Sequence, residues 1–577
     1  MQNNSEFSFK VISYIKKCSV GFLLIFLLPI FFGFLGIRPI ATPDEARYVE
    51  IPREMIAKSD WIVPYLNGFI YFEKPPFVYW IIALFLKIFS LNEYFLRLPI
   101  AILSFVTVIS QYFFVKKYEN HTIAIISTFI ISSSILWVFL SQMIILDMPL
   151  ACLTTLSLFC YYHSLQQTKV NALYAWSALG SILCGLTLLT KGLVGLAFIG
   201  MIGILWATFS KEWRKISPLY LLIQLLIILA VALPWHFAVA HRHPDFWHKY
   251  FYIEHFARYT TSYHRRYQPF WFFAPIVLLG FIPWIGPLLG SLYHAGKEKF
   301  KDYQSNVTSL QIFLYCWAGF TFFFFSFSSS KLIPYILPLF PPLSIIVAKY
   351  LYHLISTEKS KYISMMFGIP SVFLAIAFFI TGIKYHQLNL TLSDINDIPL
   401  GYLWIFSGLF FTLFLCSFAF KQHFFKTSFV FFLAWMYGFH FTVFKVAATV
   451  QKPSMQSLCK HLQQSSSKDD HVWMYTVYFQ DIPLYLNKNV KIIDYLGELE
   501  YGVHANTSQN WVLNSHQWKN ILSKTDFTQN QTHWIFTKES KILDLVQNFP
   551  FLQLIDKKCE QNFCLIKAIR SKTAQIN

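Results

Sequence analysis

The chain has 577 residues, of which 55% are hydrophobic and only 13% are charged. A soluble globular protein carries about a quarter charged residues, so this composition excludes a soluble enzyme. The net charge is +18, but Lys and Arg lie in short loops between apolar runs, where they set membrane topology and meet anionic membrane lipids. We therefore expect a polytopic membrane protein that does not bind nucleic acid.

The first apolar run, residues 19–37, follows Lys10, Lys16 and Lys17. It is long for a signal peptide and has no small-residue cleavage site after it, so we predict a retained transmembrane helix. Basic loops later in the chain should face the cytoplasm. The apolar runs consistent with those loops lie near 19–37, 94–115, 121–140, 149–165, 172–188, 191–210, 217–236, 269–290, 309–327, 333–355, 363–382, 400–420 and 426–449. They predict about thirteen transmembrane helices with an outer C-terminus.

Two segments fall outside this series. The apolar run Phe77–Phe89 is too short to span a bilayer, so we predict a re-entrant or interfacial helix on the outer side. From residue 451 the composition becomes polar, with strand-like stretches at 472–479 and 489–496. The predicted domains are a helical membrane domain, residues 1–450, with an outer first loop at 38–76, and a soluble periplasmic α/β domain, residues 451–577.

The cysteines give one further indication about the terminal domain. Cys559 and Cys564 flank the sequence EQNF, a spacing that suits a disulfide across a hairpin in an oxidising compartment. The other cysteines have no metal-type spacing and are typical of small core residues.

The first loop is rich in charge. Glu50, Arg53, Glu54 and Asp60 are typical of amphipathic surface helices whose charges face water. Asp44 and Glu45 follow a proline at a helix start, where a carboxylate either caps the helix or serves chemistry.

Isolated charges also occur at the outer ends of apolar runs. Asp147 lies in SQMIILDMPL and Lys191 in LTLLTKGLVGLA. An ionisable group at membrane depth is costly unless it is paired or hydrated, although a lysine also snorkels to the interface, so the two suggest a shared polar cavity. Other outer segments add Glu254, His255, Arg258, His264, Arg265, Arg266, Lys331 and Tyr335. Cations, carboxylates and histidines beside a bilayer fit an enzyme that acts on a phosphate-bearing lipid.

At these residues the chain resembles the 4-amino-4-deoxy-L-arabinose lipid A transferases, a GT-C family of membrane glycosyltransferases related to protein O-mannosyltransferases. The resemblance rests on PDEARYVEIPREM and its continuation to residue 80, then LDMPL, LTKG, DFWHKYFYIEHFARY, HRRYQPFWFF, SSSKLIPYILP and GELEYG, in the family's order. It implies transfer of the aminosugar from undecaprenyl phosphate to lipid A phosphate with inversion, on the periplasmic side of the bacterial inner membrane. Polymyxin and cationic peptide resistance would follow, because an aminosugar cancels negative surface charge.

The resemblance also implies roles for individual residues. Asp44 matches the catalytic first-loop carboxylate, Asp147 is a second catalytic candidate, and Glu73 with His255 matches a metal-binding pair, possible ligands of Zn²⁺. His264 is the alternative histidine, in a context that departs from the family's form. The substrate-binding candidates are Glu45, Arg47, Lys74, Lys191, Arg258, Lys331 and Tyr335.

Two alternatives remain open at this point. A sibling enzyme would transfer another lipid-linked sugar, such as galactosamine to lipid A or mannose to protein. A lipid transporter would also carry isolated membrane carboxylates, although the chain shows no repeat and no paired broken helices, and its first loop is large and charged.

Overall fold

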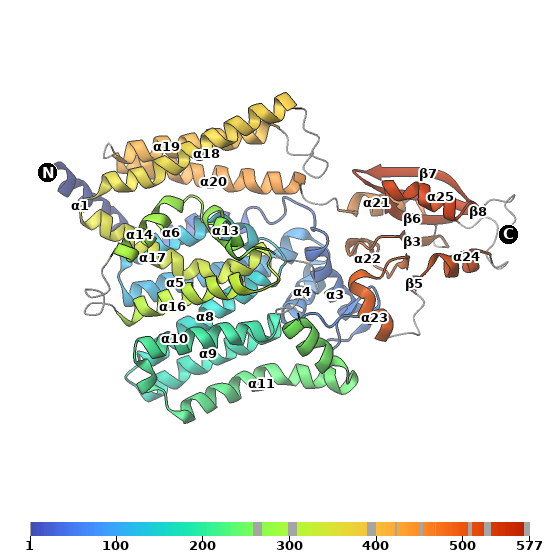
Figure 1. Cartoon of the computed structure of the whole chain (residues 1–577), viewed down its shortest axis with the longest axis horizontal. Helices are drawn as coiled ribbons and strands as arrows, with labels where there is room; N and C mark the ends of the chain where they lie inside the picture. Colours follow the sequence, from blue (N-terminus) through green and yellow to red (C-terminus); the bar gives the residue numbers. More distant parts are fainter. Residues whose placement is uncertain are drawn as a thin grey trace. The chain divides into compact units, whose positions relative to one another are not determined.

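The computed structural model describes residues 2–257, 268–297, 308–388, 400–421, 424–450, 454–467, 469–505, 511–523 and 532–570. Its contacts divide the chain into two units (Figure 1). We call residues Met1–Arg38 with Arg97–Val450 the membrane unit, and Pro39–Leu96 with Gln451–Asn577 the mixed unit. One boundary between the units therefore lies at residue 450, as predicted for the membrane domain. The first loop was predicted to belong to the membrane domain, but its contacts group it with the C-terminal residues.

The membrane unit is helical. Each predicted apolar run overlaps a helix or a group of helices. The elements are α1 (Gln2–Lys17), α2 (Val20–Phe32), α5 (Glu93–Tyr118), α6 (His121–Ser133), α7 (Ile135–Ser141), α8 (Asp147–Leu165), α9 (Val170–Lys191), α10 (Leu193–Phe209), η1 (Glu212–Lys215), α11 (Pro218–Arg242), η2 (His248–Ala257), η3 (Phe270–Phe272), α13 (Phe273–Gly280), α14 (Ile285–Lys297), α16 (Ser309–Phe327), η4 (Ile333–Leu339), α17 (Phe340–Ser356), α18 (Ser360–Leu388), α19 (Leu400–Lys421) and α20 (Phe425–Val450).

Fewer of these helices than predicted are long enough to cross a bilayer unbroken. Within the described ranges eight qualify by length and composition, and two bent pairs, α1 with α2 and α6 with α7, raise the number to ten rather than thirteen. Three predicted spans account for the difference. The helices α8 and α10 do not qualify, α10 having 17 residues, and Pro283 separates α13 from α14 within the run 269–290.

Apolar side chains on the outside of the membrane unit show that it needs a lipid surrounding. In α19 the most apolar stretch is only 22% buried within the protein, and in α18 the value is 28%. Such helices are stable where hydrocarbon covers their exposed faces. The protein is therefore an integral membrane protein.

Backbone carbonyls at the end of the first span are satisfied by buried arginines. Arg97 is fully buried and donates to the carbonyl oxygens of Leu35 and Arg38 at 2.7 and 2.8 Å. Arg38 in turn donates to the carbonyl oxygen of Gln142 at 3.0 Å. Because unpaired backbone groups are expensive in a dry interior, these bonds fix how the chain leaves α2.

The mixed unit joins a first-loop segment to an α/β domain. The first-loop elements are α3 (Asp44–Lys58), β1 (Tyr65–Leu66), β2 (Phe69–Ile70) and α4 (Phe77–Phe89), and α4 has the bounds predicted for the short helix. The C-terminal elements are α21 (Gln456–Ser465), β3 (His471–Tyr475), α22 (Asp481–Leu486), β4 (Lys491–Ile493), η5 (Gly497–Leu499), α23 (Glu500–Ala505), β5 (Val512–Leu513), α24 (Ser515–Ser523), β6 (Thr532–Lys538), η6 (Glu539–Lys541), α25 (Ile542–Asn548), β7 (Leu552–Glu560) and β8 (Phe563–Arg570).

A six-stranded sheet forms the centre of the α/β domain. Its order is β5-β4-β3-β6-β8-β7 (Figure 1). The first four strands are parallel, and β8 pairs antiparallel with both β6 and β7. Trp473, Trp518 and Ile566 lie in its apolar core. The strand-like stretches predicted at 472–479 and 489–496 contain β3 and β4, so the predicted α/β class is confirmed.

The first-loop segment is held to this domain by buried polar contacts. Asn67 donates to the carbonyl oxygen of Val490 at 2.8 Å and accepts from its N–H at 2.9 Å. Arg53 makes hydrogen bonds to the side-chain oxygens of Asn487 and Asn489. These contacts explain why residues 39–96 group with residues more than 400 positions later.

The prediction that Glu50, Arg53, Glu54 and Asp60 face water is wrong for the three residues that lie in α3. Glu50 and Glu54 are buried, and Arg53 is nearly so. Arg53 donates two hydrogen bonds to the Glu50 carboxylate at 2.6 and 2.7 Å, and Glu54 accepts from the N–H of Gly68 at 2.8 Å. The partners that bury these groups come from the β1–β2 hairpin and the C-terminal domain, which helical periodicity does not show.

Candidate functional site

The predicted meeting of Asp147 and Lys191 occurs in the membrane unit. Lys191 Nζ lies 2.5 Å from Asp147 Oδ1, although the residues are 44 positions apart. Asp147 is the first residue of α8 and Lys191 the last of α9, so each charge is also stabilised by the helix dipole at its own terminus. Gly192, with φ of 81°, ends α9 directly after the lysine. The two side chains retain 15% and 14% exposure, so the pair remains accessible.

Tyr335 completes this cluster. The Lys191 ammonium lies 4.3 Å from the centre of the Tyr335 ring, a cation–π distance. Tyr335 belongs to η4, and the adjoining Lys331 is buried and donates to the carbonyl oxygens of Gln268 at 2.8 Å and Ser328 at 2.6 Å. Thus Lys191 meets an aromatic face and a carboxylate, whereas the hydrogen bonds of Lys331 tie two chain segments together.

In the mixed unit the neighbouring residues Asp44 and Glu45 differ in exposure. Pro43, not Asp44, is the N-cap of α3, and the Asp44 side chain is 62% exposed. Glu45 is buried and accepts from the N–H of Ala41 at 2.9 Å. Glu45 therefore holds the turn that precedes α3, and Asp44 presents its carboxylate at the helix N-terminus.

Arg47 links Asp44 to the C-terminal domain. Its Nε lies 2.8 Å from Glu498 Oε2, and its Nη1 lies 3.9 Å from Asp44 Oδ1. Gln480 donates to the same Glu498 carboxylate. Burial raises the pKa of the Glu498 carboxyl, and Arg47 opposes that shift. A carboxylate, a guanidinium and a second carboxylate thus form a chain that ends at the exposed Asp44.

Glu73 and Lys74 lie in the same unit. Burial acts to lower the pKa of Arg47, and the charges of Tyr71, Glu498, Tyr48 and Glu73 raise it. Glu73 is therefore within electrostatic reach of that guanidinium. Lys74 Nζ donates to the carbonyl oxygen of Glu73 at 2.7 Å. Of the first-loop residues predicted for the site, Asp44 and Glu73 therefore lie near the Arg47 guanidinium, and Lys74 contacts Glu73.

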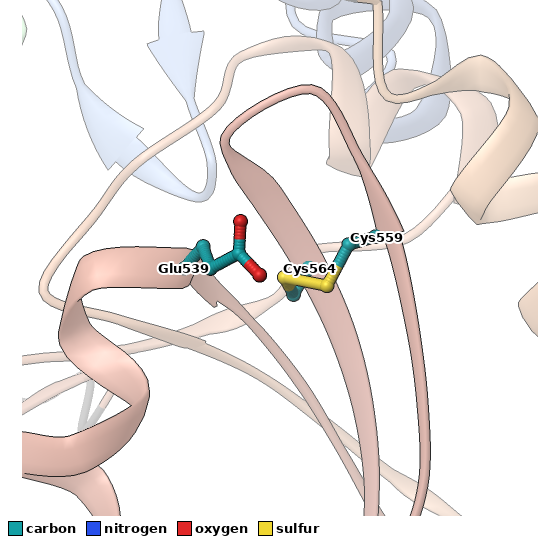
Figure 2. Close-up of side chains that lie close together, drawn as sticks. All are labelled: Glu539, Cys559 and Cys564. Carbon is teal, nitrogen blue, oxygen red and sulfur yellow. A yellow bond between two sulfur atoms is a disulfide. The ribbon is translucent and has the colours of Figure 1, made fainter.

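The metal candidates are not brought together by the described residues. His255 belongs to η2, but its side chain, like Arg258 and His264, lies outside what the structure describes. Where side chains are described, one group of three metal-type ligands occurs, Glu539 with Cys559 and Cys564. Figure 2 shows that the two sulfur atoms are bonded to each other, so they are not available to a metal. This bond is the predicted hairpin disulfide, which joins β7 to β8.

Comparison with known proteins agrees with these observations. The family model of dolichyl-phosphate-mannose-protein mannosyltransferases matches residues 20–250. An undecaprenyl phosphate-alpha-4-amino-4-deoxy-L-arabinose arabinosyl transferase of Proteus mirabilis is 33% identical over 61% of this chain and 63% of its own length. A relative of the same name from Photorhabdus laumondii is 32% identical over 63% and 64%. The chain is thus similar to these arabinosyl transferases over about three fifths of its length.

A solved structure shows the same fold as this chain. ArnT from Cupriavidus metallidurans, solved with undecaprenyl phosphate, superposes with a TM-score of 0.81 at 24% identity and covers 95% of this chain and 98% of its own. The GT-C fold is thereby confirmed. The matched segments of the curated arabinosyl transferases span slightly less than two thirds of their length.

Glu498 is the member of the Arg47 chain that sequence reasoning missed as a site residue. It lies in GELEYG, which the sequence analysis used as a family mark without assigning a role to its carboxylates. Within the motif Glu498 faces Arg47, while Glu500 is exposed. The available signal was a motif that places a carboxylate in the terminal domain of a membrane protein.

Proposed function

We propose that this protein transfers 4-amino-4-deoxy-L-arabinose from undecaprenyl phosphate to a phosphate of lipid A. The observation that carries the proposal is the accessible carboxylate of Asp44 at the start of α3, backed by Arg47 and Glu498, in a chain similar to the arabinosyl transferases. The membrane site faces the periplasm of the inner membrane in this proposal, as the distribution of basic loops predicts.

The proposed chemistry is a direct displacement at the anomeric carbon. A lipid A phosphate oxygen is already ionised near neutral pH, so the attacking group needs orientation more than a strong base. The new bond forms from that oxygen to the anomeric carbon as the bond to undecaprenyl phosphate breaks, with inversion. We assign to Asp44 the orientation of the reacting groups and the stabilisation of positive charge that develops on the sugar.

The departing phosphate requires cations. We assign this role to Lys191, whose ammonium is held between Asp147 and Tyr335. Lys74 and Arg258 are further candidates for the same phosphate. Asp147 sets the position of Lys191 and offers a carboxylate to the amine of the sugar. Neutralising charge on the leaving group in this way lowers the barrier only if the cation is fixed beforehand, which the ion pair achieves.

We also propose that a divalent metal binds near Glu73, without giving it a step in the reaction. Glu73 supplies one carboxylate near Arg47, and His255 would have to supply the second ligand. Such an ion would neutralise phosphate charge when bound. Every role assigned above belongs to side chains of the protein. Transfer by purified protein after chelation with EDTA, compared with transfer after addition of Zn²⁺, tests whether the ion is required.

The decisive experiment is lipid A mass spectrometry in a strain that lacks its own transferase. Expression of the wild type should add the mass of an aminopentose to lipid A, and a hexosamine or no addition would contradict the assignment of the sugar. We expect Asp44→Asn to lower transfer at least about 100-fold with normal protein levels. Asp60→Asn is the matched control, because Asp60 accepts from the N–H groups of Ile62 and Val63, which the amide oxygen of Asn also does.

A further inference from the structure

A cavity lies in the membrane unit, and the Asp147 cluster is not among the residues that line it. Its volume is 640 Å³, within the range of small-molecule sites. It lies among the ends of α1, α6, α17, α18, α19 and α20, and its walls are almost entirely apolar. Phe129, Leu351, Phe367 and Leu413 are among the residues that line it. Apolar space of this kind does not hold water, so a hydrocarbon ligand fits it.

The cavity has a basic rim. Lys17 and Lys426 line it and are exposed, and Lys426 Nζ lies 5.1 Å from the centre of the Tyr14 ring. No carboxylate occurs among the residues that line it in the described structure. The rim therefore presents two cations beside an apolar interior, which is the complement of an anionic lipid.

Helix α1 forms one wall by turning across the end of the bundle. Residues Lys10–Lys17 are bent by 80° from α2, with Val11 buried while Lys16 and Lys17 are exposed. His121 fixes the bend, since its Nε2 bonds to the carbonyl oxygen of Cys18 at 3.1 Å and its Nδ1 to the Tyr112 hydroxyl at 2.9 Å. An amphipathic segment of this kind lies in the membrane interface, with its lysines at headgroup depth.

A buried serine hydroxyl inside the cavity favours a ligand that carries a hydrogen-bond acceptor. The Ser364 hydroxyl lines the cavity, is buried, and has no hydrogen-bond partner among the described residues. A buried hydroxyl is costly without a partner, and the ester oxygens of a glycerolipid supply acceptors between the headgroup and the acyl chains.

We propose that this cavity binds one anionic glycerophospholipid, with its phosphate on Lys17 and Lys426 and its acyl chains among α6, α18, α19 and α20. The helix ends that form the cavity adjoin the basic loops that the topology places in the cytoplasm, so the lipid comes from the cytoplasmic leaflet. This structural lipid is separate from the lipid-linked donor and lipid A, and it does not depend on the transfer reaction.

The proposal is tested by thermal unfolding of the purified full-length protein in detergent. Dioleoyl phosphatidylglycerol should raise the unfolding midpoint by about 3 °C or more, whereas dioleoyl phosphatidylcholine and inorganic phosphate should not. In Lys17→Ala/Lys426→Ala this shift should be at least halved, and in Lys169→Ala, which removes an exposed lysine outside the cavity, it should be unchanged. Equal shifts with both lipids, a shift with phosphate alone, or a full shift in the double variant would overturn the proposal.

A second measurement keeps both lysines in place. Native mass spectrometry of the wild type should show one bound phosphatidylglycerol per protein in the presence of an equal amount of phosphatidylcholine. Ser364→Phe, which fills the cavity, should lose that adduct. Retention of the adduct in Ser364→Phe, or a wild type that binds the two lipids equally, would contradict the cavity as the site.

Discussion

The two ion pairs Asp147–Lys191 and Arg47–Glu498 have similar geometry, but the sequence marks only the first of them. Their nitrogen–oxygen distances are 2.5 and 2.8 Å, and all four side chains are between 14% and 16% exposed. The first pair stands out in the sequence because each charge interrupts an apolar run, where a lone charge needs a partner. The second lies in charged segments where nothing marks one carboxylate among many.

The pairs also differ in what they are connected to. Lys191 meets Asp147 and the face of Tyr335, and both partners leave it accessible to a ligand. Arg47 is bound on several sides, by Glu498, by Asp44 at longer range and by the charge of Glu73. We infer that the first pair is built for binding and the second for holding the first loop in place.

The largest expected effect separates these two roles by activity. Lys191→Ala should lower kcat/KM for transfer by about 10²–10³-fold, because it removes a positioned cation from the leaving phosphate. Lys349→Ala is the matched control, since Lys349 forms an equally short pair with Glu119 in the same unit outside the candidate site. Transfer assays on purified protein measure both. Similar losses in the two variants would show that Lys191 acts through stability.

The converse test concerns stability. Glu498→Gln removes the nearest carboxylate charge from Arg47 and should cost about 3 kcal/mol in the free energy of unfolding of the mixed unit. Glu500→Gln, in the same motif but exposed, should cost less than about 0.5 kcal/mol. Hydrogen exchange of peptides covering α3 reports the difference. If the two variants exchange alike, the Arg47 chain does not hold the first loop.

Burial of a titratable histidine provides a third, smaller effect. Burial, reinforced by His471, lowers the pKa of His533 to about 4 from an unfolded value of 6.5, with Asp470 opposing. The unfolded chain then binds the proton more readily, so stability is complete above pH 6.5 and falls as the pH drops toward 4. Between pH 7 and pH 5 the loss due to His533 is about 2 kcal/mol.

The variant His533→Gln isolates this contribution. Burial raises the pKa of Asp481 to about 6, which acts in the opposite direction, so only the difference between wild type and variant is informative. That difference in unfolding free energy should depend on pH in His533→Gln and not in His516→Gln, where the histidine is exposed. A pH-independent difference would mean that folding does not shift the pKa of His533.

The smallest effect is expected from the covalent link. Cys559→Ser/Cys564→Ser should destabilise the β7–β8 hairpin by about 1 to 2 kcal/mol, since the loop that the disulfide closes is short. Reductant should destabilise the wild type by the same amount and leave the variant unchanged. A wild type isolated from cells with both thiols free would instead place the terminal domain in a reducing compartment, against the predicted topology.

The features that could be predicted are those that a short stretch of sequence indicates by itself. Apolar length indicated the helices, a short run indicated α4, and the spacing of Cys559 and Cys564 indicated a disulfide. Isolation in an apolar context was enough to pair Asp147 with Lys191. Glu50 and Glu54 were predicted on the surface because helical periodicity describes one helix at a time, and their covering partners are distant in the chain.

Pairing with distant partners also explains the residues whose roles differ from expectation. Lys331 was predicted to bind substrate, and its ammonium contacts two backbone carbonyls that no pattern in the sequence marks. Glu45 and Asp44 are neighbours with the same charge, and only the turn before α3 decides that one is buried and the other exposed.

The Asn67–Val490 contact has a consequence for biosynthesis. The two residues are 423 positions apart, and a ribosome that adds about 5–20 residues per second needs roughly 20 to 90 s to make the intervening chain. During that interval α3 has no C-terminal domain against which to bury Glu50 and Arg53, so these charges remain hydrated as its amphipathic sequence allows. Closure of so long a loop is a late step in folding, and it follows the synthesis of every apolar helix of the membrane unit.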